Sequence, residues 1–193
     1  YILQKINSFV FGNIAKLMEN KVLLSNHLRK QILSLSEEEK NQKVLSFIST
    51  IETDSYFFER DGEFYCLSYY IKDSFTYLKT KSPNIAFEAG KCFASFLEST
   101  QDIAIEDLNI TFPKFHNVGY RYQQFITALE NADRERINKA KTLIDRSMEL
   151  SEEMFELDKL LEKGGLPIRI CHNDSKLSNI LFDKYDKGLC IID

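Results

Sequence analysis

The sequence predicts an α+β fold in which a mostly antiparallel β region, residues 1–71, is followed by a mostly helical region, residues 72–193. Three observations support this prediction. Runs rich in β-forming residues are concentrated in the first part of the chain. The pair Asp61-Gly62 between two of these runs is typical of a two-residue hairpin turn. After Ile71, apolar residues recur at helical spacing instead, and strands segregated from helices are typical of α+β domains.

The β region begins with a strand and includes one helix. Residues 1–6 predict the strand. A helix over 13–30 is predicted by apolar residues at helical spacing, namely Ile14, Leu17, Met18, Leu24 and Leu28. Residues 36–42 are polar and acidic, which predicts either a loop or the frayed start of a helix. The remaining β-rich runs are 44–49, 55–59 and 64–71.

The helical region has clear start and stop signals. Ser82 is a good N-cap and Pro83 suits the first helical position, so a helix is expected to begin there. Its apolar face is formed by Ile85, Ala89, Phe93, Phe96 and Leu97. Further helices are expected at 119–130 and 132–163, and the second is ended by Gly164-Gly165 and Pro167. The chain closes with strands near 179–183 and 188–193 and a turn at 184–187.

The composition excludes several classes of protein. Of the 193 residues, 44% are apolar and 28% are charged, an ordinary globular mixture that rules out a disordered, collagen-like or disulfide-built chain. The net charge of −4 disfavours a basic nucleic-acid-binding surface. No apolar run approaches the ~18 residues needed to cross a bilayer. We therefore expect neither a nucleic acid nor a membrane as partner, and the composition sets no oligomeric state.

The cysteines and the chain ends bear on location and completeness. The four cysteines are widely spaced and form no Cys-x-x-Cys pair, which favours free thiols in a reducing cytoplasm over disulfides or a zinc site. The first residue, Tyr1, lies inside an alternating stretch, and the last, Asp193, closes an apolar strand. We therefore expect a chain that is truncated at both ends.

One polar segment lies between apolar strands in the last part of the sequence. It has the pattern His-x-Asp-x-Lys-x-x-Asn, beginning at His172 and ending at Asn179, and a strand, a turn and a second strand ending in Asp193 follow it. An Asp and an Asn in a catalytic loop, with another Asp after it, form the signature of kinases. A lone His-x-Asp is common by chance, but the added Lys176, Asn179 and final Asp make a chance match a poor explanation.

Each residue type in the pattern suits phosphoryl transfer. Asp174 can accept the proton of an acceptor hydroxyl, and Lys176 can place its ammonium beside phosphoryl oxygens as their charge shifts. Asn179 and Asp193 offer the hard oxygen atoms that Mg²⁺ prefers. Because a hairpin returns its two ends to the same place, both can share one ion with the phosphates of ATP. We interpret His172 as a brace for the loop rather than as an acid or base.

The chain resembles the aminoglycoside phosphotransferase-like small-molecule kinases, and within them the N-acetylhexosamine 1-kinase group. The loop 172–179 carries the resemblance to the kinase-like fold. The resemblance to the hexosamine-kinase group rests on softer blocks in matching order and spacing, namely 1–7, 10–11, 18–20, 88–93, 115–117, 121–122 and 166–169.

The resemblance implies a bilobal protein-kinase-like fold, with ATP in the cleft between the lobes and a small-molecule hydroxyl as acceptor. In this group the acceptor is the anomeric hydroxyl of an N-acetylhexosamine. By position, Asp174 is implied as the catalytic base, and Asn179 and Asp193 as the ligands of Mg²⁺. Residues 67–71 fall at the inter-lobe hinge, where a core-edge strand is the alternative interpretation. The hinge backbone that would bind adenine is that of Tyr69, Tyr70 and Ile71.

The chain departs from the family pattern at three points. The family's glycine-rich phosphate loop would lie before Tyr1, and the region that completes its acceptor pocket would lie after Asp193, so we expect the segment 1–193 alone to be inactive. The place of the family's strand lysine, which binds the phosphates, is taken by either Lys5 or Gln4. Glu19 is either the helix carboxylate that pairs with that lysine or a residue of a solvated helix surface.

Some alternatives stay open. Residues 115–117 with Arg121 form a further polar-aromatic cluster, which either approaches the acceptor or stabilises the start of the next helix. The same chemistry on another small alcohol, such as an aminoglycoside, choline or homoserine, is a second possible function. A pseudokinase-like protein that binds without catalysis is a third.

Overall fold

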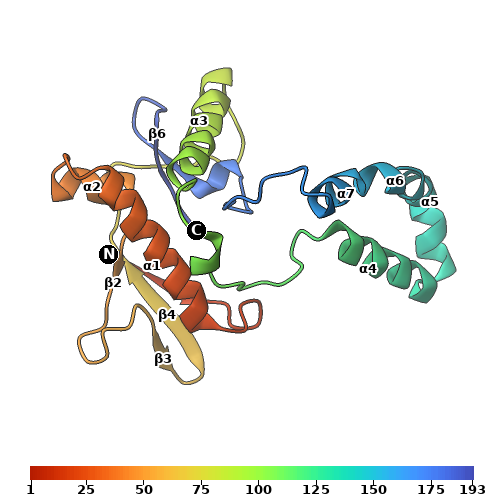
Figure 1. Cartoon of the computed structure of the whole chain (residues 1–193), viewed down its shortest axis with the longest axis horizontal. Helices are drawn as coiled ribbons and strands as arrows, with labels where there is room; N and C mark the ends of the chain where they lie inside the picture. The colour runs from red at the N-terminus through yellow and green to blue at the C-terminus, as the bar shows by residue number, and fades with distance from the viewer. The chain divides into compact units, whose positions relative to one another are not determined.

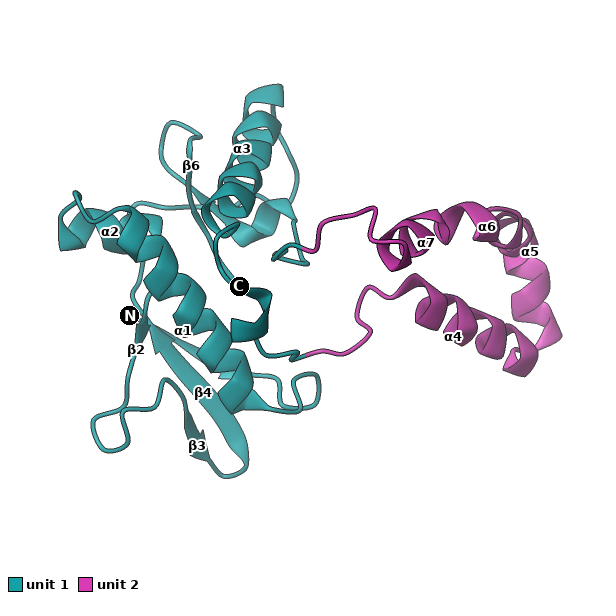
Figure 2. Ribbon diagram, viewed as in Figure 1, with its two compact units in different colours: residues 1–111, 169–193 teal, residues 112–168 magenta.

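The computed structural model describes all 193 residues and shows a mixed α+β chain with small antiparallel sheets. By its contacts the chain separates into two compact units (Figure 2). Unit 1 comprises residues 1–111 and 169–193, and unit 2 comprises residues 112–168. The lobe boundary that the sequence predicts after residue 71 stays a prediction. No helix of either unit is both long enough and apolar enough to cross a membrane.

The larger sheet of unit 1 is built around one central strand (Figure 1). Strand β4 pairs antiparallel with all three other strands. The four strands are β1 (Ile2–Ile6), β2 (Phe47–Ile48), β3 (Phe58–Arg60) and β4 (Glu63–Ser68). The predicted hairpin turn is confirmed, because Arg60 pairs with Glu63 across Asp61 and Gly62, whose φ angles are 55° and 76°. Positive φ at both central residues is what such a two-residue turn requires.

Helix α1 (Ile14–Gln31) packs on this sheet and forms the first buried cluster (Figure 1). Asn13 caps it, because the Asn13 side chain accepts a hydrogen bond from the backbone of Lys16. The buried members of the cluster come from β1, α1 and β4, and they are Ile6, Ile14, Leu17, Met18 and Cys66. The polar stretch that follows is a helix, α2 (Glu37–Lys43), which begins with a reciprocal capping box between Ser36 and Glu39.

A second buried cluster lies between α3 (Pro83–Ser99) and a two-stranded sheet made of β5 (Ile180–Phe182) and β6 (Gly188–Ile191). Ser82 caps α3 with Pro83 in its first turn, as the sequence predicts. The cluster is formed by Ile85, Ile180 and Phe182. Two short 3₁₀ turns, Ile105–Asp107 and Leu177–Asn179, complete the unit, and the second leads directly into β5.

Unit 2 consists of helices only. They are α4 (Val118–Asn131), α5 (Arg134–Glu149), α6 (Ser151–Met154) and α7 (Glu156–Glu162). The predicted single helix over 132–163 is therefore wrong, because the chain turns at Leu150 and at Phe155. The turn at Phe155 lets its ring pack edge-on against Tyr122 of α4, with 5.6 Å between the ring centroids. The predicted stop is confirmed, since α7 ends at Glu162 and Gly164 has a φ of 69°.

Candidate functional site

Three polar side chains of the loop before β5 form one hydrogen-bonded cluster. Lys176 donates from Nζ to Asp174 Oδ2 over 2.6 Å, and Asn179 donates from Nδ2 to the same oxygen over 3.0 Å. Asn179 Nδ2 also lies 3.0 Å from the backbone oxygen of Asp174. The structure thus brings together three of the residues that the sequence predicts for the site.

The backbone explains why the loop holds this shape. The N–H of Lys176 donates to the carbonyl of Asp174 over 2.8 Å, and the N–H of Asn179 donates to the carbonyl of Lys176 over 3.0 Å. From outside the loop, the Thr76 hydroxyl donates to the carbonyl of Ser178 over 3.0 Å. Asn179 is buried and is followed by the fully buried Ile180, so the end of the loop is anchored in the second cluster.

The hairpin brings Asp193 back to the loop, as the sequence predicts. Ile180 pairs with Ile191, and the N–H of Ile192 donates to the carbonyl of Asn179 over 2.9 Å. Asp193 follows directly, and its Oδ1 accepts a hydrogen bond from Gln4 Nε2 over 3.3 Å. Strand β1 and the two ends of the β5–β6 hairpin therefore meet in unit 1.

The charges of the cluster support one another. The hydrogen bond from Lys176, together with that from Asn179, holds the pKa of Asp174 below its ordinary value. The hydrogen bond to Asp174, with the added negative charge of Asp193, raises the pKa of Lys176. Asp174 is therefore ionised and Lys176 protonated at neutral pH.

His172 has the contacts of a brace. Its Nε2 lies 3.2 Å from the carbonyl oxygen of Ile192, which ties the loop to the end of the hairpin. Its ring packs edge-on against Phe93 and Phe96 of α3, at centroid distances of 5.5 and 5.9 Å. Its other nitrogen, Nδ1, is buried without a hydrogen-bond partner. These contacts support the interpretation of His172 as a structural residue.

The structure decides which of the two β1 residues faces Asp193. Successive side chains point to opposite faces of a strand. Gln4 lies against Asp193, whereas Lys5 pairs with Glu63 at an exposed position, and this contact raises the pKa of Lys5. The structure does not bring Lys5 to the cluster. Glu19 accepts a hydrogen bond from Asn109 Nδ2 over 3.0 Å, and the carboxylate that pairs with Lys5 is that of Glu63.

The predicted hinge residues follow β4 directly, because β4 ends at Ser68 rather than at Ile71. The N–H of Tyr69 donates to the carbonyl of Ser46, and its ring packs on Tyr1 with 5.7 Å between centroids. Ile71 is buried. The exposed Tyr70 uses neither its N–H nor its C=O for a hydrogen bond within the chain, so both are available to a ligand.

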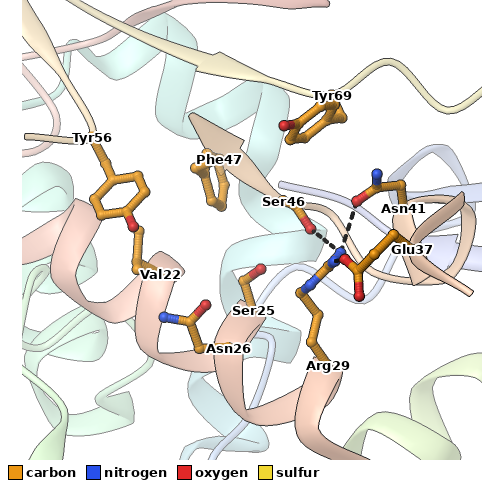
Figure 3. Close-up of a pocket in the computed structure, with 10 residues that line it drawn as sticks. All are labelled: Val22, Ser25, Asn26, Arg29, Glu37, Asn41, Ser46, Phe47, Tyr56 and Tyr69. Carbon is orange, nitrogen blue, oxygen red and sulfur yellow. Dashed lines mark hydrogen bonds and ion pairs between the residues drawn. The ribbon is translucent and has the colours of Figure 1, made fainter. Parts of the chain in front are cut away.

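A pocket of about 420 Å³ lies on α1, α2 and β2, away from the predicted catalytic residues (Figure 3). The side chain of Arg29 points into this pocket, and three neighbouring side chains bind its guanidinium. Its guanidinium donates to Asn41 and Ser46 over 2.8 and 2.9 Å and pairs with Glu37 at 2.5 Å. Asp174 and the residues of its cluster do not line this pocket, whereas Tyr69 of the predicted hinge does.

In unit 2, the polar-aromatic cluster supports the start of α4. The side chain of Asn117 accepts a hydrogen bond from the N–H of Tyr120 over 2.7 Å, which makes it the N-cap. Arg121 Nε donates to the carbonyl of Phe115 over 2.9 Å. These contacts favour the interpretation of a loop that stabilises the helix start.

The donor set can be tested against a divalent cation. Asn179 Oδ1 and Asp193 Oδ2 accept no hydrogen bond from the chain, so each has a hard oxygen to offer. No group of three or more His, Cys, Asp or Glu side chains is arranged to hold a metal. Mg²⁺ commonly keeps several waters and takes its remaining ligands from one or two protein oxygens and from phosphates. The free oxygens of Asn179 and Asp193 are therefore of the chemical kind that a Mg²⁺ ion shared with a polyphosphate takes as ligands.

Two residues of the site could not be assigned from the sequence. Ile6 of β1 is buried, and Gln4 is two positions earlier, so the structure places Gln4 on the same face of the strand as this buried residue. Nothing in the sequence indicates that Thr76 contacts the loop, because a single threonine after a strand is common in proteins and predicts no particular contact. A comparison of the chain with models of known protein families finds no match.

Proposed function

We propose that this chain belongs to a kinase-like, bilobal phosphotransferase that moves the γ-phosphoryl group of ATP to a small-molecule hydroxyl with the help of Mg²⁺. The proposal assigns it to the aminoglycoside phosphotransferase-like family. One observation carries the proposal: Asp174, Lys176 and Asn179 form a single hydrogen-bonded cluster, with Asp193 returned beside it by the β5–β6 hairpin.

Asp174 is the proposed catalytic base. Its carboxylate is exposed, so an acceptor hydroxyl can approach it, and its lowered pKa keeps it ionised. A carboxylate with a low pKa is a weak base, which suits a loose transition state in which the hydroxyl proton leaves late. The main role of Asp174 is then to orient the acceptor oxygen and to receive its proton at Oδ1, because Oδ2 already accepts hydrogen bonds from Lys176 and Asn179.

Lys176 is the proposed cation for the transferring group. In the structure its ammonium is held 2.6 Å from Oδ2 of Asp174. The other oxygen of this carboxylate, Oδ1, would face the acceptor. The raised pKa of Lys176 keeps it charged, so it can donate hydrogen bonds to phosphoryl oxygens as they gain charge. Asp174 positions this ammonium in advance, which lowers the cost of reorganisation during the reaction.

Asn179 and Asp193 would hold the cation. Asn179 keeps Oδ1 free because its Nδ2 is bound to Asp174, and Asp193 keeps Oδ2 free. When bound there, Mg²⁺ would neutralise charge on the ATP phosphates. The free N–H and C=O of Tyr70, between Tyr69 and Ile71, support adenine binding by this connection.

The acceptor class rests on the resemblance to the N-acetylhexosamine 1-kinases, which favours the anomeric hydroxyl of N-acetylglucosamine or N-acetylgalactosamine. One observation favours a non-catalytic nucleotide-binding protein instead. The β1 residue that lies against Asp193 is Gln4, a neutral residue, whereas the resemblance implies a phosphate-binding lysine on this strand.

An acceptor panel tests these possibilities. The complete natural protein is given Mg²⁺, ATP and one acceptor at a time, and ADP and the phosphorylated product are measured by ³¹P NMR. We expect product with the two N-acetylhexosamines and none with an aminoglycoside, choline or homoserine. Product with one of the others keeps the phosphotransferase and replaces the acceptor. Calorimetric binding of Mg·ATP without any product would support the non-catalytic protein, and the absence of both would contradict the proposal.

A further inference from the structure

We infer that Gln4 is a positioning residue, which orients Asp193 toward a divalent cation without neutralising its charge and thereby makes nucleotide binding depend on the metal. This inference rests on the proposed function, because it concerns the same site.

The Gln4 amide is held at both ends. Its Nε2 donates to Asp193 Oδ1 over 3.3 Å. Its Oε1 accepts a hydrogen bond of 3.8 Å from Sγ of Cys66, the residue of β4 that pairs with Gln4 in the sheet. Burial keeps the pKa of the Cys66 thiol raised, so Cys66 stays a donor and Oε1 stays its acceptor. The NH₂ end of the amide therefore has to face Asp193.

The choice of an amide has an electrostatic consequence. A hydrogen bond from a neutral group fixes the carboxylate of Asp193 and leaves its negative charge in place for a cation. A lysine at the same place would pair with Asp193 directly and compete with a metal for it. The one cation on β1, Lys5, is already paired with Glu63 on the other face of the strand.

The charges beside the proposed cation position are unevenly placed. Asp174 and Asp193 each carry one negative charge, Lys176 is paired with Asp174, and Lys21 acts electrostatically on Cys66 from the pocket that Asp193 also lines. Gln4 adds no charge. The carboxylate of Asp193, which is paired with no cation, would repel a polyphosphate that arrives without a metal, and a divalent cation bound to it would remove this repulsion. Metal-free ATP is therefore expected to bind far more weakly than Mg·ATP.

Calorimetry of ATP binding with and without Mg²⁺ tests the inference, since the ratio of the two dissociation constants reports the metal dependence and needs no turnover. In the complete protein, Gln4→Leu is expected to weaken Mg·ATP binding about tenfold, the usual order for a residue that orients a metal ligand. Gln4→Lys is expected to strengthen metal-free ATP binding and to lower the ratio about tenfold. A merely structural role of Gln4 would not produce that gain. Gln101→Leu, the same change at an exposed site, is the matched control.

The outcomes separate the inference from the function on which it rests. If Asp193→Asn weakens Mg·ATP binding while both Gln4 variants keep the wild-type ratio, the inference is overturned and the proposed function stands. The inference is also overturned if Lys5→Gln, and not a change at Gln4, lowers the ratio. If the wild-type protein binds no Mg·ATP, or Asp193→Asn binds it as tightly as the wild type, the proposed metal site fails and the inference with it.

Discussion

The two compact units differ in how their conformation is held. Unit 1 has two clusters of buried apolar side chains, and the candidate site is attached to both, through β1 in one and β5 in the other. In unit 2 no residue is fully buried, and large apolar side chains such as Leu143 on α5 and Leu157 on α7 are 73% and 64% exposed.

The helices of unit 2 are stabilised mainly by interactions between residues close in the sequence. Asn117 and Asp133 cap the starts of α4 and α5. Exposed ion pairs four residues apart, Glu135 with Lys139 and Lys141 with Asp145, follow along α5. Each such pair contributes only about 0.3–0.5 kcal/mol.

The difference between the two units shows that buried neighbouring residues are what place a side chain precisely. Ile180 and Phe182, which are fully buried, follow Asn179 and hold the end of the loop in place. Caps and exposed pairs specify a helix but not the position of its side chains against a partner. Chemistry that depends on distances near 3 Å between Asp174 and Asn179 therefore belongs in unit 1.

The largest effect on stability is expected from the core of unit 1. Phe182 is fully buried, and Phe182→Ala should lower the free energy of unfolding by about 3–5 kcal/mol, through lost burial and the cavity left behind. Leu143→Ala in unit 2 removes an exposed side chain and should change it by less than about 0.5 kcal/mol. Urea unfolding of both variants measures the difference. Similar losses of unfolding free energy in the two variants would contradict the described difference in burial between the two units.

A smaller effect, of opposite sign in the two units, is expected from adding one methyl group. A Cβ at Gly188 would lie 2.1 Å from Sγ of Cys92, so Gly188→Ala should cost about 1–3 kcal/mol of stability. A Cβ at Gly119 on α4 meets only ordinary contacts, 3.7 Å or longer, so Gly119→Ala should stabilise by about 0.5–1 kcal/mol. Thermal unfolding of the two variants gives the signs. A stabilising Gly188→Ala would show that α3 and β6 are not packed as described.

The smallest effect concerns the titration of the site. Because the folded-state pKa of Asp174 lies below its ordinary value of 3.8, its ionised form stabilises the protein above that pH, and this contribution is lost as the pH falls through the lowered pKa. Lys176→Met should move the pKa of Asp174 upward and shrink the pH dependence of stability below about pH 4. Carboxyl ¹³C NMR follows the titration, with Lys141→Met on α5 as control. Titration of wild-type Asp174 at or above the ordinary pKa would contradict the described ion pair.

Much of the local structure could be predicted from the sequence, because its signals are local. The turn at Asp61-Gly62, the helix start at Ser82 and the stop at Gly164 are each specified by residues beside them. The cluster of Asp174 and Asn179 was predictable for the same reason, since both residues lie in one short loop.

Other features depend on contacts that a sequence pattern does not contain. The breaks at Leu150 and Phe155 occur without proline or glycine and within continuous apolar periodicity, so only the packing of Phe155 on Tyr122 reveals one of them. The contact between Gln4 and Asp193 joins residues 189 positions apart. Strand β1 has apolar residues on both of its faces, such as Ile2 on the face of Gln4 and Leu3 on the face of Lys5. The strand pattern alone therefore does not decide whether Gln4 or Lys5 faces the site.

The rate of phosphoryl transfer in Asp174→Asn shows whether the loop around Asp174 is the catalytic centre. The complete protein is assayed with Mg·ATP and an N-acetylhexosamine, and Asp145→Asn, an exposed change on α5, is the control. We expect turnover in Asp174→Asn to fall by about 10²–10⁴-fold, the usual contribution of a catalytic base, with Mg·ATP affinity within about threefold of wild type. Turnover within about threefold of wild type in Asp174→Asn would contradict the assignment of this loop as the catalytic centre.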